Sequence, residues 1–184
     1  MEERNNLDEV IFTETPLAGA FVIDLEPHPD DRGFFARTFC RREFAAHGLN
    51  PEVAQCNTSF NRKAGTLRGM HYQKPPTSEA KLVRCVRGGI HDVIVDLRSE
   101  SETYGKHFAT KLTAENRRAL FVPQSFAHGF QTLEDESEIE YQMSEYYKVE
   151  SGAGFRHDDP ALAIEWPLPV SSISEQDLAW PSFF

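Results

Sequence analysis

Short apolar segments separated by turn residues follow one another along the chain, and no segment shows the sustained period of a long helix. Segments of this length, rich in Val, Ile, Phe and Tyr, are typical of β-strands. Strand candidates lie within residues 20–25, 33–39, 67–73, 81–86, 90–97, 108–112, 119–122, 129–133 and 138–147. Their regular spacing predicts an all-β fold, a two-sheet sandwich or small barrel of the jelly-roll type with a few short helices.

The connections between these segments carry signals of their own. Residues 27–31 contain two prolines and predict a loop, and residues 41–47 predict a short helix that ends at Gly48. The two glycines within residues 87–89 join two apolar segments in the pattern of a β-hairpin.

Length and charge narrow the class of protein. We expect one domain over residues 1–184, with residues 1–16 as a loose N-terminal segment. The net charge of -10 includes no long basic run to offset it, so we expect no nucleic-acid partner. No apolar run approaches the roughly 18 residues of a membrane span, so we expect no membrane contact. The three cysteines, which have no metal-type spacing and no signal peptide before them, predict reduced thiols in a cytoplasmic protein.

The segment around His71 is the strongest candidate for chemistry. Arg68 and Lys74 flank this histidine in an apolar segment, and Lys81 and Arg84 follow soon after. Burial and neighbouring positive charge both favour a neutral imidazole, which can act as a base. The cations suit an anionic substrate, so the pattern predicts proton abstraction from a compound that carries phosphate. Arg68 and His71 are three residues apart, so they reach one cavity only if the strand bends or bulges at Gly69.

Two tyrosines share one face of the expected strand over residues 138–147, because side chains on one face recur every second residue. Tyr141 could donate a proton near the reacting atom, and Tyr147 could stack on a ring further out. Both also fit the interpretation that they are aromatic residues of the core or its rim.

Five further positions are candidates, and three of them have two interpretations each. His128 lies among aromatic residues and fits either a hydrogen-bonded core histidine or a binding residue. Asp177 completes a Ser-x-x-Asp helix-capping pattern, or it orients an imidazole. Arg32 fits a surface ion pair or a binding site. Gln55 and Asn57 are polar positions on a strand.

Taken together, eight short motifs resemble the dTDP-4-dehydrorhamnose 3,5-epimerase family. They run in the family's order over nearly the whole chain after about residue 17: DRGFF at 31–35, QCN at 55–57, LRGMHYQ at 67–73, KLVR at 81–84, TAENRR at 113–118, FAHGF at 126–130, YY at 146–147, and DDP at 158–160 before IEWP at 164–167. Any one motif is weak, whereas the ordered set is highly specific.

The resemblance implies a cupin-type jelly roll that forms a homodimer and acts on a nucleotide-linked 4-keto-6-deoxyhexose without metal or organic cofactor. It implies that His71 is the catalytic base, Asp177 its paired carboxylate and Tyr141 the proton donor. The other matched positions resemble residues that contact the substrate: Lys81 and Arg68 around the keto oxygen and phosphates, Tyr147 on the nucleotide base, and Arg32, Gln55, Asn57 and His128 elsewhere.

The reaction implied by the resemblance is the inversion of C3 and C5. A proton next to a ketone becomes removable when the enolate oxygen is stabilised, and the C4 ketone activates both neighbours. His71 would take the proton from one face, and Tyr141 would return one from the other. Metal-binding cupins carry a His-x-His pair on the early strand, and here Gln73 stands at the second position.

Three positions depart from the family pattern. Arg37 and Gly152 stand where a glutamate is expected, and Gln176 stands where a lysine is expected. These positions contact the nucleotide sugar in the resembling family, so the nucleotide or the sugar is open. Our hypothesis is that Arg37 and Gln176 alter recognition of the nucleotide or its phosphates.

Several functions therefore stay open beside the 3,5-epimerase. A mono-epimerase would use the same His/Tyr pair at C3 or C5 only, and an epimerase of a differently nucleotide-linked 4-keto sugar would use it on another substrate. A 3,4-ketoisomerase, a non-catalytic sugar-nucleotide-binding cupin and a metal-dependent cupin oxygenase are more distant alternatives.

Overall fold

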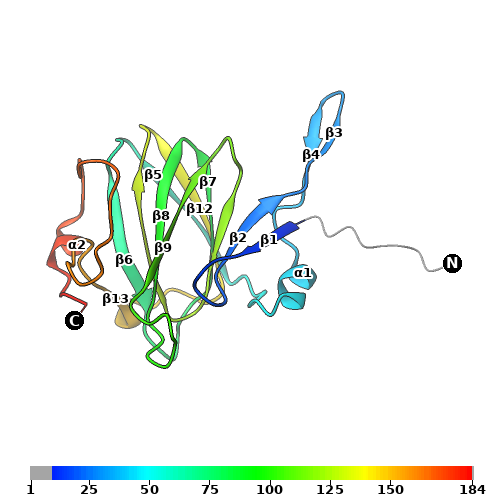
Figure 1. The fold of residues 1–184 in the computed structure, drawn as a ribbon. Helices are drawn as coiled ribbons and strands as arrows, with labels where there is room; N and C mark the ends of the chain where they lie inside the picture. The colour runs from blue at the N-terminus through cyan, green and yellow to red at the C-terminus, as the bar shows by residue number, and fades with distance from the viewer. Residues whose placement is uncertain (1–9, 184) are drawn as a thin grey trace.

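The computed structural model describes residues 10–183, whose strands form two antiparallel sheets packed face to face (Figure 1). The six-stranded sheet has the order β1 (Val10–Glu14), β2 (Phe21–Leu25), β10 (Ala119–Val122), β7 (Lys81–Arg87), β12 (Ser137–Met143), β5 (Gln55–Asn61). The five-stranded sheet has the order β13 (Gly152–Gly154), β6 (Leu67–Gln73), β11 (Phe126–Thr132), β8 (Gly89–Asp96), β9 (His107–Thr113). This arrangement confirms the all-β fold predicted from the apolar pattern.

Strand β8 shows why an almost continuous apolar run folds as a strand here. Its side chains alternate between two faces, and both faces are covered. Ile90 and Ile94 join the core between the two sheets. Val93 and Val95 join a second cluster on the outer face, which the C-terminal part of the chain covers with Phe155 and other side chains.

Helix α1 (Arg41–Ala46) packs on the outer face of the six-stranded sheet. Phe44 is fully buried there beside Phe121, and Gly48 follows the helix with a φ of 72°. Both the short helix and its glycine terminus are confirmed. A 3₁₀ turn, η1 (Val149–Ser151), and a second short helix, α2 (Glu175–Ala179), lie later in the chain.

The expected hairpin over residues 81–97 is wrong. Strands β7 and β8 follow one another through a tight turn at Gly88, but they belong to different sheets and do not pair. The turn carries the chain from one sheet to the other because each strand buries its inward side chains in the shared core.

Two expectations near the N-terminus also need correction. The expected loop over residues 27–31 contains β3 (His28–Asp30), which pairs with β4 (Gly33–Phe35) in a hairpin that stands clear of both sheets (Figure 1). The segment 1–16 is not wholly loose, because Val10–Glu14 forms β1 and pairs along its length with β2. Residues 1–9 of that segment lie outside the described residues.

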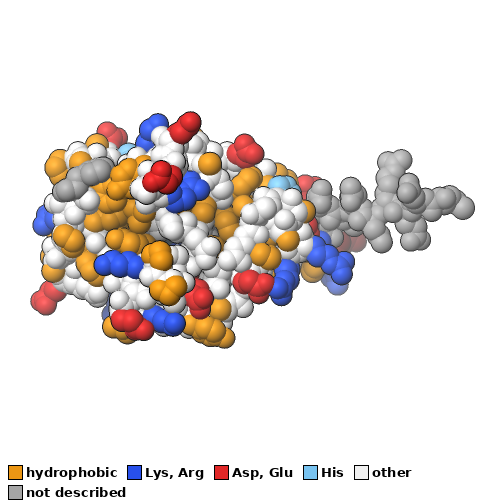
Figure 2. All heavy atoms as spheres, turned by 90° about the horizontal axis from the view of Figure 1, so that it is seen from below, with side chains coloured by type: hydrophobic (Ala, Val, Ile, Leu, Met, Phe, Trp, Pro, Cys, Tyr) orange, Lys and Arg blue, Asp and Glu red, His pale blue; other side chains and the backbone are white. Residues whose placement is uncertain are grey.

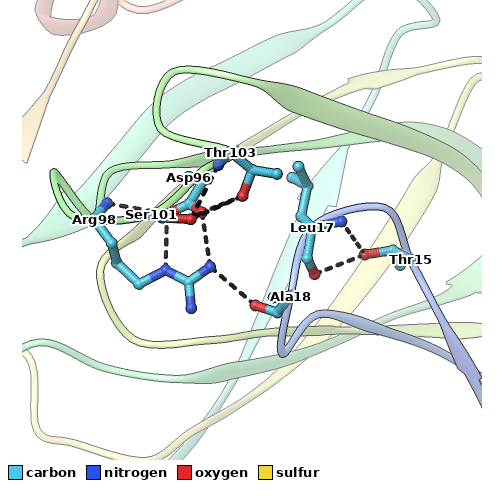
Figure 3. Close-up of polar contacts among 7 residues, drawn as sticks. All are labelled: Thr15, Leu17, Ala18, Asp96, Arg98, Ser101 and Thr103. Atoms are coloured by element: carbon cyan, nitrogen blue, oxygen red, sulfur yellow. Dashed lines mark hydrogen bonds and ion pairs between the residues drawn. The ribbon is translucent and has the colours of Figure 1, made fainter.

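A buried carboxylate fixes the turn between β1 and β2 to the loop after β8 (Figure 3). Asp96 is fully buried and accepts hydrogen bonds from Arg98, Ser101 and Thr103. The Arg98 guanidinium also donates to the carbonyl of Ala18 at 2.9 Å. This cluster therefore holds the N-terminal strands against the body of the protein.

Charge is mixed on the face of the molecule seen in Figure 2, where basic and acidic side chains are interspersed around hydrophobic ones. Within residues 10–183, none of the helices has the length and apolar character that a membrane crossing requires.

Candidate active site

A cavity of about 260 Å³ lies between the two sheets and gathers many of the residues singled out from the sequence. Strands β5, β7 and β12 of one sheet and β6 and β11 of the other supply its walls. The lining residues are Asn57, Ser59, Arg68, His71, Lys81, His128, Phe130, Tyr141 and Met143.

His71 and Asp177 form a close pair at this cavity. The Nε2 atom of His71, on β6, lies 2.6 Å from Oδ1 of Asp177, on α2. The Asp177 side chain is 5% exposed, and it also accepts hydrogen bonds from the Gly69 N–H and the Trp180 indole N–H. Ser174 caps α2 by accepting from the Asp177 N–H at 3.0 Å. The two interpretations of Asp177 do not exclude each other, since its backbone N–H binds the capping serine while its carboxylate binds the imidazole.

The charge of Asp177 follows from these contacts. Burial acts to raise the pKa of the Asp177 carboxyl, but hydrogen bonds from His71 and Gly69 outweigh it and hold the pKa below its ordinary value. An anionic carboxylate only accepts hydrogen bonds, so the ring nitrogen facing Asp177 carries a hydrogen. In the neutral imidazole, the other ring nitrogen carries no hydrogen and is the atom that can take a proton.

The expected surroundings of His71 need one correction. Its side chain is 43% exposed rather than buried, and its closest charged partner is the Asp177 carboxylate rather than a cation. Lys81 does approach, but its Nζ atom donates to the backbone carbonyl of His71 at 3.3 Å. Arg68 lines the same cavity while its Nε atom donates to Asn61 Oδ1 at 2.8 Å.

The predicted bulge at Gly69 is confirmed. The pairing of β6 with β11 shifts register between His128 and Phe130, and Gly69 has a φ of 133°, a conformation that favours glycine. A side chain there would also meet the backbone of Gly129, whose Cα lies 2.6 Å from the position of an added Cβ. This distortion lets Arg68 and His71 both line the cavity.

Tyr141 projects into the cavity from β12, on the opposite sheet from His71. Its ring lies against the imidazole of His128, with the ring centres 6.2 Å apart. Burial, together with the negative charge of Asp92, raises the pKa of the Tyr141 hydroxyl. The hydroxyl therefore keeps its proton at neutral pH and can donate it.

The expectation that Tyr147 shares a strand face with Tyr141 is wrong. Strand β12 ends at Met143, so the period of two does not extend to Tyr147. Tyr147 is 63% exposed, and its backbone N–H donates to Oε1 of Gln55 at 2.6 Å. Tyr147 and Gln55 thus lie side by side outside the set of cavity-lining residues.

Arg32 is not brought to the cavity of its own chain. Its side chain is 90% exposed on the β3–β4 hairpin and forms an ion pair with Asp30. Within this protomer, its contacts are those of a surface ion pair. Of the three departures from the family pattern, Arg37 pairs with Glu43 at 2.9 Å, Gly152 lies in β13 beside Tyr147, and Gln176 precedes Asp177 in α2.

Two buried carboxylates, each paired with a residue that lines the cavity, were not predicted from the sequence. Asp92 Oδ1 lies 2.7 Å from Nε2 of His128, and Glu79 Oε1 lies 3.0 Å from Nζ of Lys81. Three lining residues were missed as well, although strand alternation could have indicated them. Ser59, Phe130 and Met143 each follow a candidate residue by two positions and so share its face.

The position that corresponds to the second histidine of a His-x-His pair is occupied by an amide. Gln73 donates through Nε2 to the carbonyl of Thr77 and accepts through Oε1 from the N–H of Lys148. Among residues 10–183, no cluster of three or more His, Cys, Asp or Glu side chains is arranged to hold a metal ion.

Comparison with known proteins identifies the family of this chain. The family model described as dTDP-4-dehydrorhamnose 3,5-epimerase matches residues 14–184. The enzyme of that name from Methanothermobacter thermautotrophicus is 43% identical over 175 residues, which cover 94% of this chain and 94% of the relative.

Solved structures agree with this match. The dTDP-4-dehydrorhamnose 3,5-epimerase of Elizabethkingia anophelis superimposes with a TM-score of 0.92 at 36% identity, covering 95% of this chain and 97% of that one. The dTDP-6-deoxy-D-glucose-3,5-epimerase of Legionella pneumophila, solved in complex with dTDP-4-keto-L-rhamnose, has a TM-score of 0.87 at 34% identity, covering 94% and 92%.

Proposed function

The chain belongs to the dTDP-4-dehydrorhamnose 3,5-epimerase family, and on this premise we propose how its cavity performs the reaction. The chain is an isomerase that inverts C3 and C5 of a dTDP-4-keto-6-deoxyhexose. We assign the base to His71, its charged partner to Asp177 and the acid to Tyr141. The observation that carries this assignment is that His71 and Tyr141 line one cavity from opposite sheets.

The opposite placement of the two residues explains inversion. A sugar ring held between the sheets has His71 on one face and Tyr141 on the other. His71 removes the hydrogen next to the C4 ketone, and the electron pair of that C–H bond moves onto the ketone oxygen as an enolate. The enolate carbon then takes a proton from the Tyr141 hydroxyl on the other face, and proton exchange with solvent restores both residues.

The cations of the cavity stabilise the enolate in this proposal. Lys81 and Arg68 line the same space as His71, so either can donate to the oxygen at C4. Preorganised donors at a developing negative charge are typically the largest contribution to such a reaction. Asp177 contributes in turn by stabilising the imidazolium that forms when His71 takes the proton.

Solvent-deuterium uptake tests the assignment directly. The protein is incubated with dTDP-4-keto-6-deoxyglucose in D₂O, and the label is located by mass spectrometry. We expect uptake at both C3 and C5 and none in His71→Ala, with Glu136→Gln as a control that alters only an exposed ion pair. Uptake at one carbon would favour a mono-epimerase, and no uptake from any nucleotide-linked 4-keto sugar would favour a non-catalytic binding protein.

We propose that the nucleotide lies at the rim of the cavity, with Tyr147 stacking on the base and Gln55 and Asn57 contacting the substrate. Support comes from the exposure of Tyr147 and from the hydrogen bond that its backbone N–H donates to Gln55. Arg37 and Gln176 would then alter the preference for nucleotide or phosphates. Equal Michaelis constants for dTDP-, UDP- and CDP-linked substrates would contradict a sharp nucleotide preference.

We propose a homodimer in which the β3–β4 hairpin of one protomer reaches the cavity of the other. Arg32 resembles a substrate-binding residue, yet its hairpin stands clear of both sheets of its own chain (Figure 1). Phe35 on the same hairpin is 70% exposed, and an exposed phenylalanine suits an interface.

Mixing two inactive variants tests this arrangement. Dimers mixed from Arg32→Ala and His71→Ala protomers contain one cavity with both wild-type residues if Arg32 acts across the interface. We expect activity to return on mixing after subunit exchange, and size measurement by light scattering to give a dimer. If Arg32 acts within its own protomer, both cavities stay defective and no activity returns.

We propose a cytoplasmic location on the strength of the cysteines. Cys40, Cys56 and Cys85 are all free thiols in the structure. Burial raises the pKa of the Cys85 thiol to about 11, which keeps it protonated and unreactive at neutral pH. Thiol labelling of the protein after rapid alkylation of cells should find all three reduced, whereas a disulfide would contradict this location.

A further inference from the structure

Lys81 forms an ion pair with Glu79, a buried residue that is not among those lining the cavity. The Lys81 Nζ atom lies 3.0 Å from Glu79 Oε1, and the two side chains are only 8% and 4% exposed. We propose that Glu79 is a positioning residue, which holds the Lys81 ammonium where it meets the enolate oxygen. The inference rests on the proposed function and adds a residue to it.

The hydrogen bonds of Lys81 show how the ammonium is aimed. An ammonium has three N–H donors. One is directed to Glu79 Oε1, and another reaches the backbone carbonyl of His71 at 3.3 Å. Lys81 also lines the cavity, so its third donor is left for an oxygen of the substrate. Glu79 thereby fixes the lysine relative to the base, because the same ammonium binds the backbone of His71.

Glu79 is itself held by the backbone on both sides. The carbonyl of Ser78 accepts from the Gln124 side chain at 2.7 Å. The N–H of Ala80 donates to the hydroxyl of Ser144 at 2.7 Å, and the carbonyl of Ala80 accepts from the N–H of Ser144 at 3.0 Å. A carboxylate carried by so fixed a segment can place a flexible lysine accurately.

The second oxygen of Glu79 supports a role directed at Lys81. Its Oε2 atom is buried and has no hydrogen-bond partner among residues 10–183. A buried carboxylate is costly unless it is paired, so the pair with Lys81 is what compensates its burial. Removing the negative charge of Glu79 therefore affects Lys81 more directly than it affects Arg68, the other cation that lines the cavity.

The consequence for catalysis follows from the sensitivity of such sites to position. A displacement of about 1 Å in a catalytic group can reduce a rate by about 10²-fold. Glu79→Gln keeps the shape and one acceptor but loses the charge, so we expect kcat to fall about 10-fold while KM changes less than about 3-fold. A loss confined to kcat is expected because the enolate forms only during the reaction.

A double-mutant cycle with Lys81→Met tests whether Glu79 acts through Lys81. The variants E79Q, K81M and E79Q/K81M are compared with wild type by kcat, KM and the rate of deuterium uptake at C3. We expect E79Q to slow wild type but to leave K81M unchanged, because the group it positions is already gone. Glu136→Gln, which breaks an exposed ion pair, should match wild type.

Two results would overturn the proposal. One is a kcat for E79Q within twofold of wild type, and the other is an equal slowing by E79Q in the presence and absence of Lys81. If E79Q does not fold, E79M/K81M replaces it, since an apolar pair of similar volume is often tolerated in place of a buried ion pair. A rate for E79M/K81M below that of K81M would then count against the proposal. Failure of the proposed function itself is separate, because wild type would show no deuterium uptake.

Discussion

Nε2 of His71 lies 2.6 Å from Oδ1 of Asp177, although 106 residues separate them in the sequence. The contact depends on α2 packing beside β6, where the Gly69 N–H binds the same carboxylate at 3.3 Å. Trp180, the residue after this helix, lies so close to Gly154 that an added Cβ would be 2.6 Å from the indole ring. The last turn of helix in the described chain therefore completes the fold and supplies the partner of the base.

Replacing Asp177 by Asn should lower kcat by about 10²- to 10⁴-fold, the range typical of a lost acid–base contribution. The amide keeps the size of the side chain but cannot stabilise the imidazolium that forms during proton removal. The measurement is kcat together with deuterium uptake at C3 and C5. Asp158→Asn, which alters an exposed ion pair with Arg156, is the matched control. A kcat for Asp177→Asn equal to that of this control would contradict the role of Asp177.

Replacing Tyr141 by Phe should separate proton removal from inversion. The base remains, so the substrate should still lose its C3 or C5 hydrogen to solvent while inverted product falls by about 10²-fold or more. KM should change little, because only one hydroxyl is lost from the wall of the cavity. Mass spectrometry of the substrate and chiral analysis of the product measure the two steps. If Tyr141→Phe formed inverted product at the wild-type rate, Tyr141 would not be the proton donor.

The strands could be predicted from the sequence better than their assembly. Residues 119–122 match β10 at both ends, because a short apolar run bounded by polar residues and a proline is a local signal. Sheet membership is not local. The turn at Gly88 carries the same residues as a hairpin turn, and only packing across the core places β7 and β8 in different sheets.

Some residues of the candidate site could also be predicted from the sequence, and others could not. His71 and Tyr141 lie in strands whose pattern could be predicted, and the family resemblance indicated their roles. Asp92 could not be found this way, because its partner His128 is brought to it by the pairing of β8 with β11. Glu79 lies only two residues before Lys81, but the burial of this pair depends on how the rest of the chain packs over it. A buried carboxylate in an apolar strand such as β8 is a signal that a cation or imidazole lies opposite, but it does not say which one.

Replacing Gly69 by Ala should destabilise the protein and disrupt the cavity. An added Cβ would lie 2.6 Å from the Cα of Gly129, which is backbone and cannot move aside. Gly33→Ala is a matched control, because Gly33 has a similar φ of 141° but nothing within 4 Å of an added Cβ. The difference between the two variants isolates the clash, which we expect to cost about 1 to 3 kcal/mol. Equal shifts in melting temperature for the two variants would mean that the positive φ alone, and not the contact with Gly129, explains why residue 69 is a glycine.

Replacing Asp96 by Asn should weaken the link between the β1–β2 turn and the loop after β8 (Figure 3). Burial acts to raise the pKa of Asp96, but hydrogen bonds from Arg98, Thr103 and Ser101 outweigh it and hold the pKa far below its ordinary value. The carboxylate is fully buried and its partner Arg98 is one-third exposed. We therefore expect the free energy of unfolding to fall by about 3 kcal/mol at neutral pH, the lower end of the range for a broken buried ion pair.

The sign of the pH dependence follows from the lowered pKa of Asp96. A carboxyl that binds its proton less readily in the folded state than in the unfolded state contributes full stability above its unfolded pKa of about 3.9. That contribution declines as the pH falls further, because the unfolded chain takes up the proton first. The difference in melting temperature between wild type and Asp96→Asn should therefore be largest at pH 7 and should begin to shrink as the pH falls below about 4. Thermal unfolding followed by circular dichroism from pH 7 to pH 3 measures this, and a constant difference across the range would show that Asp96 stabilises the fold by its shape rather than by its charge.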